Sequence, residues 1–439
     1  MKKLLVFLCS LLFVSTNYLL VNGLPLNDLT PFPKAKWTVA VYMNGDNELE
    51  PSITGGEVTN ERYQKWFNPN REIFSVNQRY VAPGDFHTEL ASPGSNEDIH
   101  VVALIDRTPG YASNMDDWTN TRLYYIRNGD YPDDTRSLFW TNTSSLNADE
   151  LNMADTDTLN WFLDAVEKYF PSDRLYLSLW DHNWAWHSGY LQKDETSQND
   201  TMNYVSLGQM VKNRQLENKK RIDVIGYDAC VGANIEVLHT WRPIADNFAG
   251  SQDYVGWGGV NYSAVLTSLQ SNPEMSPIEL SVVIAESMLS DPQDKCASSL
   301  TLDAVNYDRV VQSIDSLACI LIDQFTSLSS QLHTLRQNLP HVPDFASDTM
   351  HLDLWTVAGG LSSSFPENSS IQAAAKNLLD ALEETVTYNT IQIGRKSCKD
   401  GHGVSIYWPM TKQQYEKDYQ RLSFAKDTKW EEFLSLFLH

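Results

Sequence analysis

The chain is short of positive charge. Its 439 residues contain 33 Lys and Arg against 56 Asp and Glu, which gives a formal net charge of −23 at pH 7. So acidic a chain lacks the basic surface that binds nucleic acid backbones, and anionic lipid headgroups repel it. With 42% hydrophobic and 20% charged residues, the composition also excludes a disordered chain and a bundle of membrane helices.

Long apolar runs are missing after the N-terminus. Lys2 and Lys3 precede an apolar stretch over residues 4–14, and small and polar residues follow. This order is typical of a secretory signal peptide, so we predict that residues 1–23 are removed by a cut before Leu24. The alternative is an uncleaved membrane anchor, for which the apolar stretch is short. We expect no membrane span in the mature chain.

Cysteine is scarce as well. Cys9 would leave with the signal peptide, and Cys230, Cys296, Cys319 and Cys398 remain. These are too few to make a disulfide scaffold in a chain of this length, and their pairing is left open by the sequence. N-x-S/T sequons fit a glycoprotein that is secreted or held in an endomembrane, lysosome-like lumen. The sequons begin at Asn142, Asn199, Asn261 and Asn368.

Short apolar runs alternate with helical patterns along the first two thirds of the chain. Residues 37–43, 99–105, 175–180 and 222–227 read as buried strands, and 157–170 reads as an amphipathic helix. This alternation predicts an α/β fold with a mainly parallel sheet flanked by helices. We expect a signal peptide over 1–23, an α/β core over 24–304 with an irregular insertion at about 51–97, and a largely helical C-terminal subdomain over 305–439 that contributes a late strand.

The common catalytic signatures are absent: there is no GxSxG, HExxH, P-loop or GxGxxG motif. Two predicted strands nevertheless end in reactive residues, because His182 follows the strand 175–180 and Cys230 follows the strand 222–227. In a parallel sheet the carboxyl ends of neighbouring strands share the edge where α/β proteins bind ligands. A thiol beside an imidazole can become a nucleophilic thiolate, and the imidazole can protonate a leaving amine. A buried core thiol with a histidine at a strand end is the structural alternative, and a His/Cys metal site is a third, without supporting CxxC or HxxxH spacing.

Several ordered motifs resemble the clostripain family of cysteine peptidases. Asp-His-x-x-x-Trp begins at Asp181, and Ile-Gly-Tyr-Asp-Ala-Cys ends at Cys230. Further family landmarks occur in the same order at residues 37–50, 152–155, 299–305 and 403–409. The resemblance therefore covers about residues 37–409, and the ordered set is far more specific than any one motif.

The resemblance implies a caspase-like fold and roles for particular residues. Cys230 would attack the scissile carbonyl, and His182 would act as general acid and base. Backbone N–H groups of Cys230 and of Asn183, the residue after the histidine, would bind the oxyanion. The family usually has Gly where this chain has Asn183, and Trp184 follows it.

The family prefers Arg or Lys before the cut, which an acidic pocket explains. Asp228 matches the family's acid two residues before the cysteine, with a helix cap as its structural alternative. The position of a second family acid falls near Gly258, so we expect Asp253 to take its place if its loop bends inward.

The resulting hypothesis is a secreted or lumenal cysteine endopeptidase that cuts peptides or proteins after Arg or Lys through an acyl-enzyme. The alternative is a catalytically inactive, clostripain-like secreted binding protein, and transpeptidation would use the same acyl-enzyme. The resemblance implies no cofactor, with Ca²⁺ as a weak alternative because some relatives need it. The acidic surface suits Ca²⁺, but the chain has no EF-hand pattern.

Overall fold

The computed structural model describes most of the chain from Leu24 onward. The described residues are 24–26, 29–50, 53, 56–57, 81–82, 84–108, 119–130, 138–141, 150–256, 258–290, 296–342, 349–391 and 401–439. The predicted signal peptide, most of residues 51–80 of the predicted insertion, Asn142 and Cys398 lie outside them.

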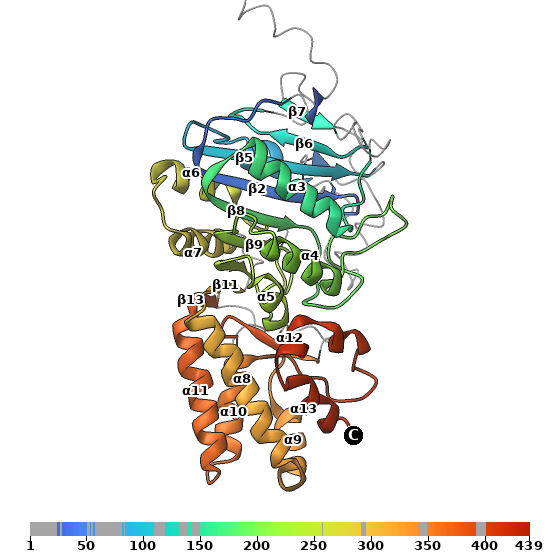
Figure 1. Cartoon of the computed structure of the whole chain (residues 1–439), viewed down its shortest axis with the longest axis vertical. Coiled ribbons are helices and arrows are strands. Elements are labelled where there is room, and N and C mark those ends of the chain that lie inside the picture. Colours follow the sequence, from blue (N-terminus) through green and yellow to red (C-terminus); the bar gives the residue numbers. More distant parts are fainter. Residues whose placement is uncertain are drawn as a thin grey trace, which may run out of the picture.

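The described strands form one large mixed sheet and two small ones (Figure 1). The large sheet has ten strands in the order β1-β7-β6-β5-β2-β8-β9-β10-β11-β13. Its strands are β1 (Leu24–Pro25), β2 (Ala35–Gly45), β5 (Ile99–Arg107), β6 (Arg122–Tyr125), β7 (Leu138–Thr141), β8 (Ser172–Trp180), β9 (Val224–Asp228), β10 (Asn247–Gly250), β11 (Cys296–Thr301) and β13 (Val386–Ile391). The small sheets pair β12 (His351–Asp353) with β14 (Ser405–Tyr407), and β3 (Gly56–Glu57) with β4 (Val81–Ala82).

The centre of the large sheet is parallel. The pairs β5–β2, β2–β8, β8–β9 and β9–β10 are all parallel, and all nine residues of β5 are buried. Near-continuous apolar runs form such strands because helices cover both faces of a parallel sheet. The predicted α/β fold with a mainly parallel sheet is confirmed.

Alternate residues of the central strands enter two separate cores. Leu177 of β8 packs with helices on one face, whereas its neighbour Tyr176 packs with helices on the other, as the alternation of strand side chains requires. The first core is formed with α3 (Thr156–Tyr169), α4 (Tyr204–Leu216) and α5 (Ile235–Trp241). The second is formed with α6 (Tyr262–Ser271), α7 (Pro277–Ser287) and the π-helix η2 (Asp85–Leu90).

The C-terminal helices extend the first core. Figure 1 shows α8, α9, α10 and α11 grouped below the sheet, and their buried side chains belong to the same cluster as those of α3 and α5. The helices of this part are α8 (Asn306–Asp323), α9 (Phe325–Asn338), α10 (Leu354–Ser364), α11 (Ser369–Thr385), α12 (Ser423–Asp427) and α13 (Trp430–Phe437), with the 3₁₀ turn η4 (Lys417–Arg421). A further 3₁₀ turn, η3 (Met288–Ser290), directly follows α7. β13 and β14, the last two strands, also lie within residues 305–439.

Two further features bear on the sequence predictions. Every helix within the described part of the chain is too short or too polar to cross a bilayer. Cys296 is disulfide-bonded, whereas Cys230 and Cys319 are outside any disulfide.

Two leucines should differ strongly in their contribution to the free energy of unfolding, because one belongs to the first core and the other is exposed. Leu177 is fully buried, so Leu177→Ala should lower the free energy of unfolding by about 2–5 kcal/mol through lost burial and a residual cavity. Leu216, at the end of α4, is 70% exposed, and Leu216→Ala should change it by less than about 0.5 kcal/mol. Urea denaturation of both variants measures the difference, and equal midpoints would contradict this assignment of the core.

Candidate active site

The two reactive residues of the sequence analysis lie at the carboxyl ends of neighbouring strands. β8 and β9 pair in parallel, and Trp180 of β8 is in register with Asp228 of β9. His182 lies two residues after Trp180, and Cys230 lies two residues after Asp228. Because Trp180 and Asp228 are paired, the two reactive residues lie at the same level of the sheet edge. Both line one cavity of about 620 Å³.

The backbone after Cys230 turns sharply. Val231 has a positive φ of 52°, and its N–H donates to the carbonyl oxygen of Asp253 at 2.9 Å. A side chain at Gly232 would lie 2.7 Å from Cβ of Tyr227, so only glycine allows the chain to pass so close to the strand it has left. The Cys230 thiol faces the carbonyl oxygen of Val255, with an Sγ–O distance of 3.9 Å. This turn presents the sulfur at the cavity.

Asn183 connects the two loops through its side chain. Its Nδ2 donates to the carbonyl oxygen of Cys230 at 2.9 Å, and its Oδ1 accepts from the hydroxyl of Tyr204 at 3.0 Å. The sequence analysis considered only the backbone N–H of Asn183. The structure adds a buried amide that fixes the position of the cysteine relative to the histidine.

Glu48 is the nearest described charge partner of His182. Its Oε1 lies 3.3 Å from Nε2 of His182, and both side chains are partly buried. Burial alone would lower the pKa of His182, but the hydrogen bond to Glu48 and the negative charges of Asp181 and Glu48 outweigh burial and raise it. Burial would likewise raise the pKa of Glu48, yet the hydrogen bond from His182 lowers it to about 2. The pairing therefore favours an imidazolium beside a carboxylate.

Asp181 holds the end of β8 against the end of β2. Its two carboxylate oxygens accept from Nδ2 of Asn47 at 2.9 Å and Nδ2 of Asn44 at 3.2 Å. Burial raises the pKa of Asp181 to about 7, against the opposing effect of the His182 charge. Asp181 is thus a structural link whose charge also acts on His182.

A second pair of carboxylates, Asp85 and Asp228, lines another part of the cavity, here called the acidic wall. Oδ1 of Asp228 accepts from the N–H of Val260 at 2.9 Å, and a side chain at Gly259 would lie 2.2 Å from the same oxygen. Oδ2 of Asp85 accepts from Nε1 of Trp180 at 2.8 Å. Gly259 therefore makes room for the carboxylate of Asp228. Asp228, which the family resemblance predicts as a substrate-binding residue, thus lines the cavity.

The ionised forms of the carboxyl groups in the acidic wall are disfavoured by burial and, for Asp85, by neighbouring negative charges. Burial raises the pKa of Asp228 to about 7, and burial followed by the charges of Glu89 and Asp228 raises the pKa of Asp85. Burial also raises the pKa of Glu89 to about 7. A cation entering here would relieve this repulsion.

Asp253 does not join the acidic wall. It is fully buried and is not among the cavity-lining residues; its Oδ1 accepts from the N–H of Tyr254. The loop does not bend inward because its backbone is tied to Val231 of the cysteine turn. Asp85, from η2 in the predicted insertion, lies at the cavity instead, and no sequence pattern indicated it.

Trp184, the residue after Asn183, forms part of the aromatic side of the cavity. Its ring centroid lies 5.7 Å from that of Tyr190 and 5.6 Å from that of Tyr254, and all three residues line the cavity. Glu416, from the C-terminal part of the chain, also lines the cavity. The described lining residues thus include five carboxylates and no Lys or Arg. The cavity therefore suits a ligand with a cationic group.

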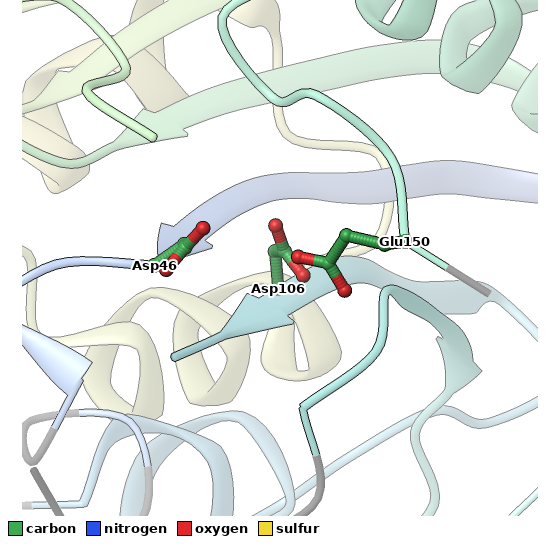
Figure 2. Close-up of side chains that lie close together, drawn as sticks. All are labelled: Asp46, Asp106 and Glu150. Atoms are coloured by element: carbon green, nitrogen blue, oxygen red, sulfur yellow. The ribbon is translucent and has the colours of Figure 1, made fainter. Parts of the chain in front are cut away.

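A separate acidic cluster lies at the ends of β2 and β5 (Figure 2). One carboxylate oxygen from each of Asp46, Asp106 and Glu150 lies within 4.8 Å of the others. We call this cluster the acidic triad. Among the described residues, this is the group of His, Cys, Asp or Glu side chains whose ligand atoms lie close enough together that they could hold a metal ion.

Comparison with known proteins identifies the family to which the chain is similar over most of its length. The model of the clostripain family (peptidase family C11) matches residues 77–437. The clostripain of Hathewaya histolytica is 20% identical over 377 residues, which cover 73% of this chain and 70% of that protein.

Solved structures show the same fold. A secreted C11 cysteine protease from Bacteroides thetaiotaomicron in complex with an irreversible peptide inhibitor aligns with a TM-score of 0.57 and 18% identity, covering 90% of this chain and 99% of that one. An inactive zymogen C11 protease from Parabacteroides distasonis aligns with a TM-score of 0.54 and 18% identity, covering 91% and 99%. These likenesses confirm the predicted caspase-like fold. Because the family model spans most of the sequence, this chain belongs to the clostripain family and is a cysteine-type endopeptidase.

Proposed function

We propose that this protein is a secreted or lumenal endopeptidase that hydrolyses peptide bonds after Arg or Lys, with Cys230 as nucleophile and His182 as general acid and base. The observation that supports it best is the meeting of the two residues at one acidic cavity, where paired strands end. The predicted signal peptide supports the secretory route, and a structural relative is a secreted protease.

The proposed reaction proceeds through an acyl-enzyme. The Cys230 thiolate attacks the scissile carbonyl carbon and forms a C–S bond, while the carbonyl oxygen becomes an oxyanion. Backbone N–H groups of Cys230 and Asn183 stabilise that oxygen. The imidazolium of His182 then gives its proton to the departing amine nitrogen as the C–N bond breaks. Water, deprotonated by the same imidazole, attacks the thioester and releases the carboxylic acid and the thiolate. These steps use no cofactor.

Glu48 positions the imidazole in this scheme. Because Nε2 of His182 faces Glu48, we assign proton transfer with the thiol and the leaving amine to Nδ1. The carboxylate also favours the imidazolium, which is the form that stabilises a neighbouring thiolate. Glu48 therefore acts through His182 and does not itself touch the substrate.

The acidic wall supplies the proposed preference for basic residues. A guanidinium beside Asp228 and Asp85 would form charge-assisted hydrogen bonds, and Arg suits two carboxylates through its fork of N–H donors. In this chain Asp85 takes the part of the second acid, whose expected position falls near Gly258. The cation also stabilises the ionised form of Asp228, which burial disfavours in the free protein.

The inactive binding protein remains the second candidate because the rings of Trp184 and Tyr254 line the same cavity as Cys230. In that case the acidic wall would still bind basic peptides, but the thiol would not be activated. Transpeptidation would share the acyl-enzyme and would differ only in the nucleophile that releases it. Product analysis by mass spectrometry separates ligation from hydrolysis.

Replacing the nucleophile should abolish hydrolysis. Cys230→Ala should lower kcat/KM on Arg peptides at least about 1,000-fold, because no other group can form the acyl-enzyme. Cys319→Ala, which removes the other described thiol outside a disulfide, should leave kcat/KM unchanged. Iodoacetamide at mildly acidic pH should label Cys230 much faster than Cys319. Slow labelling of Cys230 together with no peptide hydrolysis would favour the binding protein.

Removing either carboxylate of the acidic wall should weaken selection of a positive charge. Asp228→Asn and Asp85→Asn should each lower the ratio of kcat/KM for an Arg peptide to that for its citrulline analogue by about 10- to 100-fold, the value of a charge-assisted hydrogen bond. Citrulline has almost the shape of arginine but no charge, so the ratio cancels general damage to the enzyme. Asp253→Asn is the control and should leave the ratio unchanged. An effect of Asp253→Asn as large as that of Asp85→Asn would contradict this assignment.

Glu48→Gln should move the alkaline limb of the kcat/KM–pH profile to lower pH. That limb reports loss of the imidazolium proton in the free enzyme, and removing the Glu48 charge removes a cause of the raised pKa of His182. Glu416→Gln is the matched control, since it removes another cavity carboxylate that pairs with His187 and not with His182. Equal shifts in both variants would show that the ion pair with Glu48 has no special effect.

A further inference from the structure

Glu416 is a carboxylate of the catalytic cavity to which the proposed reaction gives no role. It lines the cavity from the segment directly before η4, in the C-terminal part of the chain. Its Oε1 lies 2.7 Å from Nδ1 of His187, and its N–H donates to the hydroxyl of Tyr407 at 3.2 Å. These contacts fix the carboxylate at the cavity before any ligand binds.

The acidic wall is anchored on one face of the large sheet. Asp85 accepts a hydrogen bond from Nε1 of Trp180, and Asp228 accepts one from the N–H of Val260. Trp180 and Val260 both belong to the second core, which α6 and α7 form with the sheet. Both carboxylates are therefore held from the side of the sheet that these helices cover.

Glu416 is anchored on the other face of the sheet. Its partner His187 stacks on Trp186, with ring centroids 4.5 Å apart, and Trp186 packs edge-on against Tyr407 at 5.0 Å. Trp186 and Tyr407 belong to the first core. The cavity of about 620 Å³, which Cys230 also lines, therefore reaches across the edge of the sheet and has carboxylates at both ends.

The loop after β8 places aromatic rings close to Glu416. The carbonyl oxygen of Trp184 accepts from the N–H of His187 at 3.0 Å, so one tight turn carries both residues. The ring centroids of Tyr190 and Tyr254 lie 5.7 Å and 5.6 Å from that of Trp184. Tyr190 is 46% exposed, which leaves its ring open to a ligand. We call Trp184, Tyr190 and Glu416 the aromatic subsite.

The aromatic subsite combines two groups that recognise an organic cation. The face of an aromatic ring attracts an ammonium or guanidinium group, and a carboxylate accepts charge-assisted hydrogen bonds from it. His187 occupies one oxygen of Glu416, but 44% of the Glu416 side chain is exposed, so a ligand can reach the carboxylate. Among the described lining residues, no Lys or Arg competes for this position.

We propose that the aromatic subsite binds a second basic side chain of the substrate, so that the protein selects peptides with paired or closely spaced Arg or Lys residues. This inference rests on the function proposed above, in which the first basic side chain enters the acidic wall. A cavity of about 620 Å³ lies within the range of roughly 300–1,000 Å³ that encloses a drug-sized ligand, so it has room for two side chains. Two fixed ends also restrain the peptide between them, which favours productive placement of the scissile bond.

Cleavage of peptides with two arginines tests the aromatic subsite. The two Arg residues are adjacent or are separated by one, two or three positions, and in matched peptides citrulline replaces the Arg that does not precede the cut. For at least one spacing, the wild type should prefer Arg over citrulline at this second position by about tenfold in kcat/KM, the value of a charge-assisted contact. Glu416→Gln keeps the shape of the side chain but removes its charge, so it should bring that ratio close to one.

The two ends of the cavity should respond independently. Asp228→Asn should lower the preference for Arg before the cut and leave the preference at the second position unchanged, whereas Glu416→Gln should do the opposite. Asp418→Asn is the matched control, because it removes an exposed carboxylate of η4 that pairs with Arg421 and lies outside the cavity lining. It should change neither ratio.

A purely structural role for Glu416 gives a different pattern. If Glu416 only holds its segment in place, Glu416→Gln lowers kcat/KM by the same factor for every peptide, and the ratio at the second position does not move. That pattern, no preference at the second position in the wild type, or equal changes in Glu416→Gln and Asp418→Asn would overturn the proposal.

Tyr190→Leu replaces Glu416→Gln should the latter fail to fold. Tyr190 is exposed, and leucine keeps an apolar side chain while removing the aromatic ring. The ratio at the second position should fall about threefold, as expected for a lost cation–π contact. An unchanged ratio in Tyr190→Leu would contradict the proposed subsite.

Binding without cleavage separates the aromatic subsite from the proposed peptidase function. In Cys230→Ala, calorimetric titration should show about tenfold tighter binding of the two-arginine peptide than of its citrulline analogue, and adding Glu416→Gln should remove the difference. If this difference is found but the wild type hydrolyses no peptide, the peptidase function fails and the subsite stands. If peptides are cut after Arg but neither cleavage nor binding depends on the second arginine, the subsite fails and the peptidase function stands.

Discussion

The parallel pairing of β2, β8 and β9 is the constraint on which the site depends. Trp180 is in register with Asp228 and Met43 with Trp180, so three strands end at one level of the sheet. Glu48, His182 and Cys230 then follow within a few residues of those ends. A slip of one residue between two parallel strands would turn every side chain of the moved strand to the opposite face. The two apolar cores on either side of the sheet oppose such a slip, because Leu177 and Tyr176 would each exchange their surroundings. Core packing thus sets the geometry of the polar residues.

Buried negative charge is the second constraint. Acidic groups at the cavity and at the strand ends are removed from water, which raises the pKa values of Asp181, Asp228 and Glu89 to about 7. Such a distribution lowers the stability of the free protein, yet it favours any cation that enters. The net charge of −23 adds a long-range field that attracts positively charged molecules. The same charges therefore act on the approach of a cation and on its entry into the cavity.

The sequence allowed the fold and the two reactive residues to be predicted because both depend on local pattern. Apolar runs followed directly by His182 and Cys230 placed these residues at strand ends, and the family resemblance added Asp228. Asp85 was not predictable in the same way. It lies in η2, within a segment with no apolar periodicity, and it reaches the cavity only because η2 packs against α6 and the second core.

Asp253 is the reverse of Asp85: the sequence made it a candidate, but it does not line the cavity. Its position in the sequence made it a candidate, but the hydrogen bond from Val231 to its backbone turns the loop away from the cavity. The side chain of Asn183 was equally hidden from sequence reasoning, because its partners Cys230 and Tyr204 are brought to it by two different strands and a helix. Contacts between segments distant in the chain decide these cases, and no local pattern records them.

The acidic wall and the acidic triad differ in how open they are to solvent. Asp85 and Asp228 line a cavity, and each accepts a hydrogen bond from a neutral donor, Nε1 of Trp180 or the N–H of Val260. The oxygens of Asp46 and Asp106 that lack partners are closed off from solvent, so no peptide side chain can reach them. The two acidic groups therefore differ in what can reach them, although both lie where strands of the central sheet end.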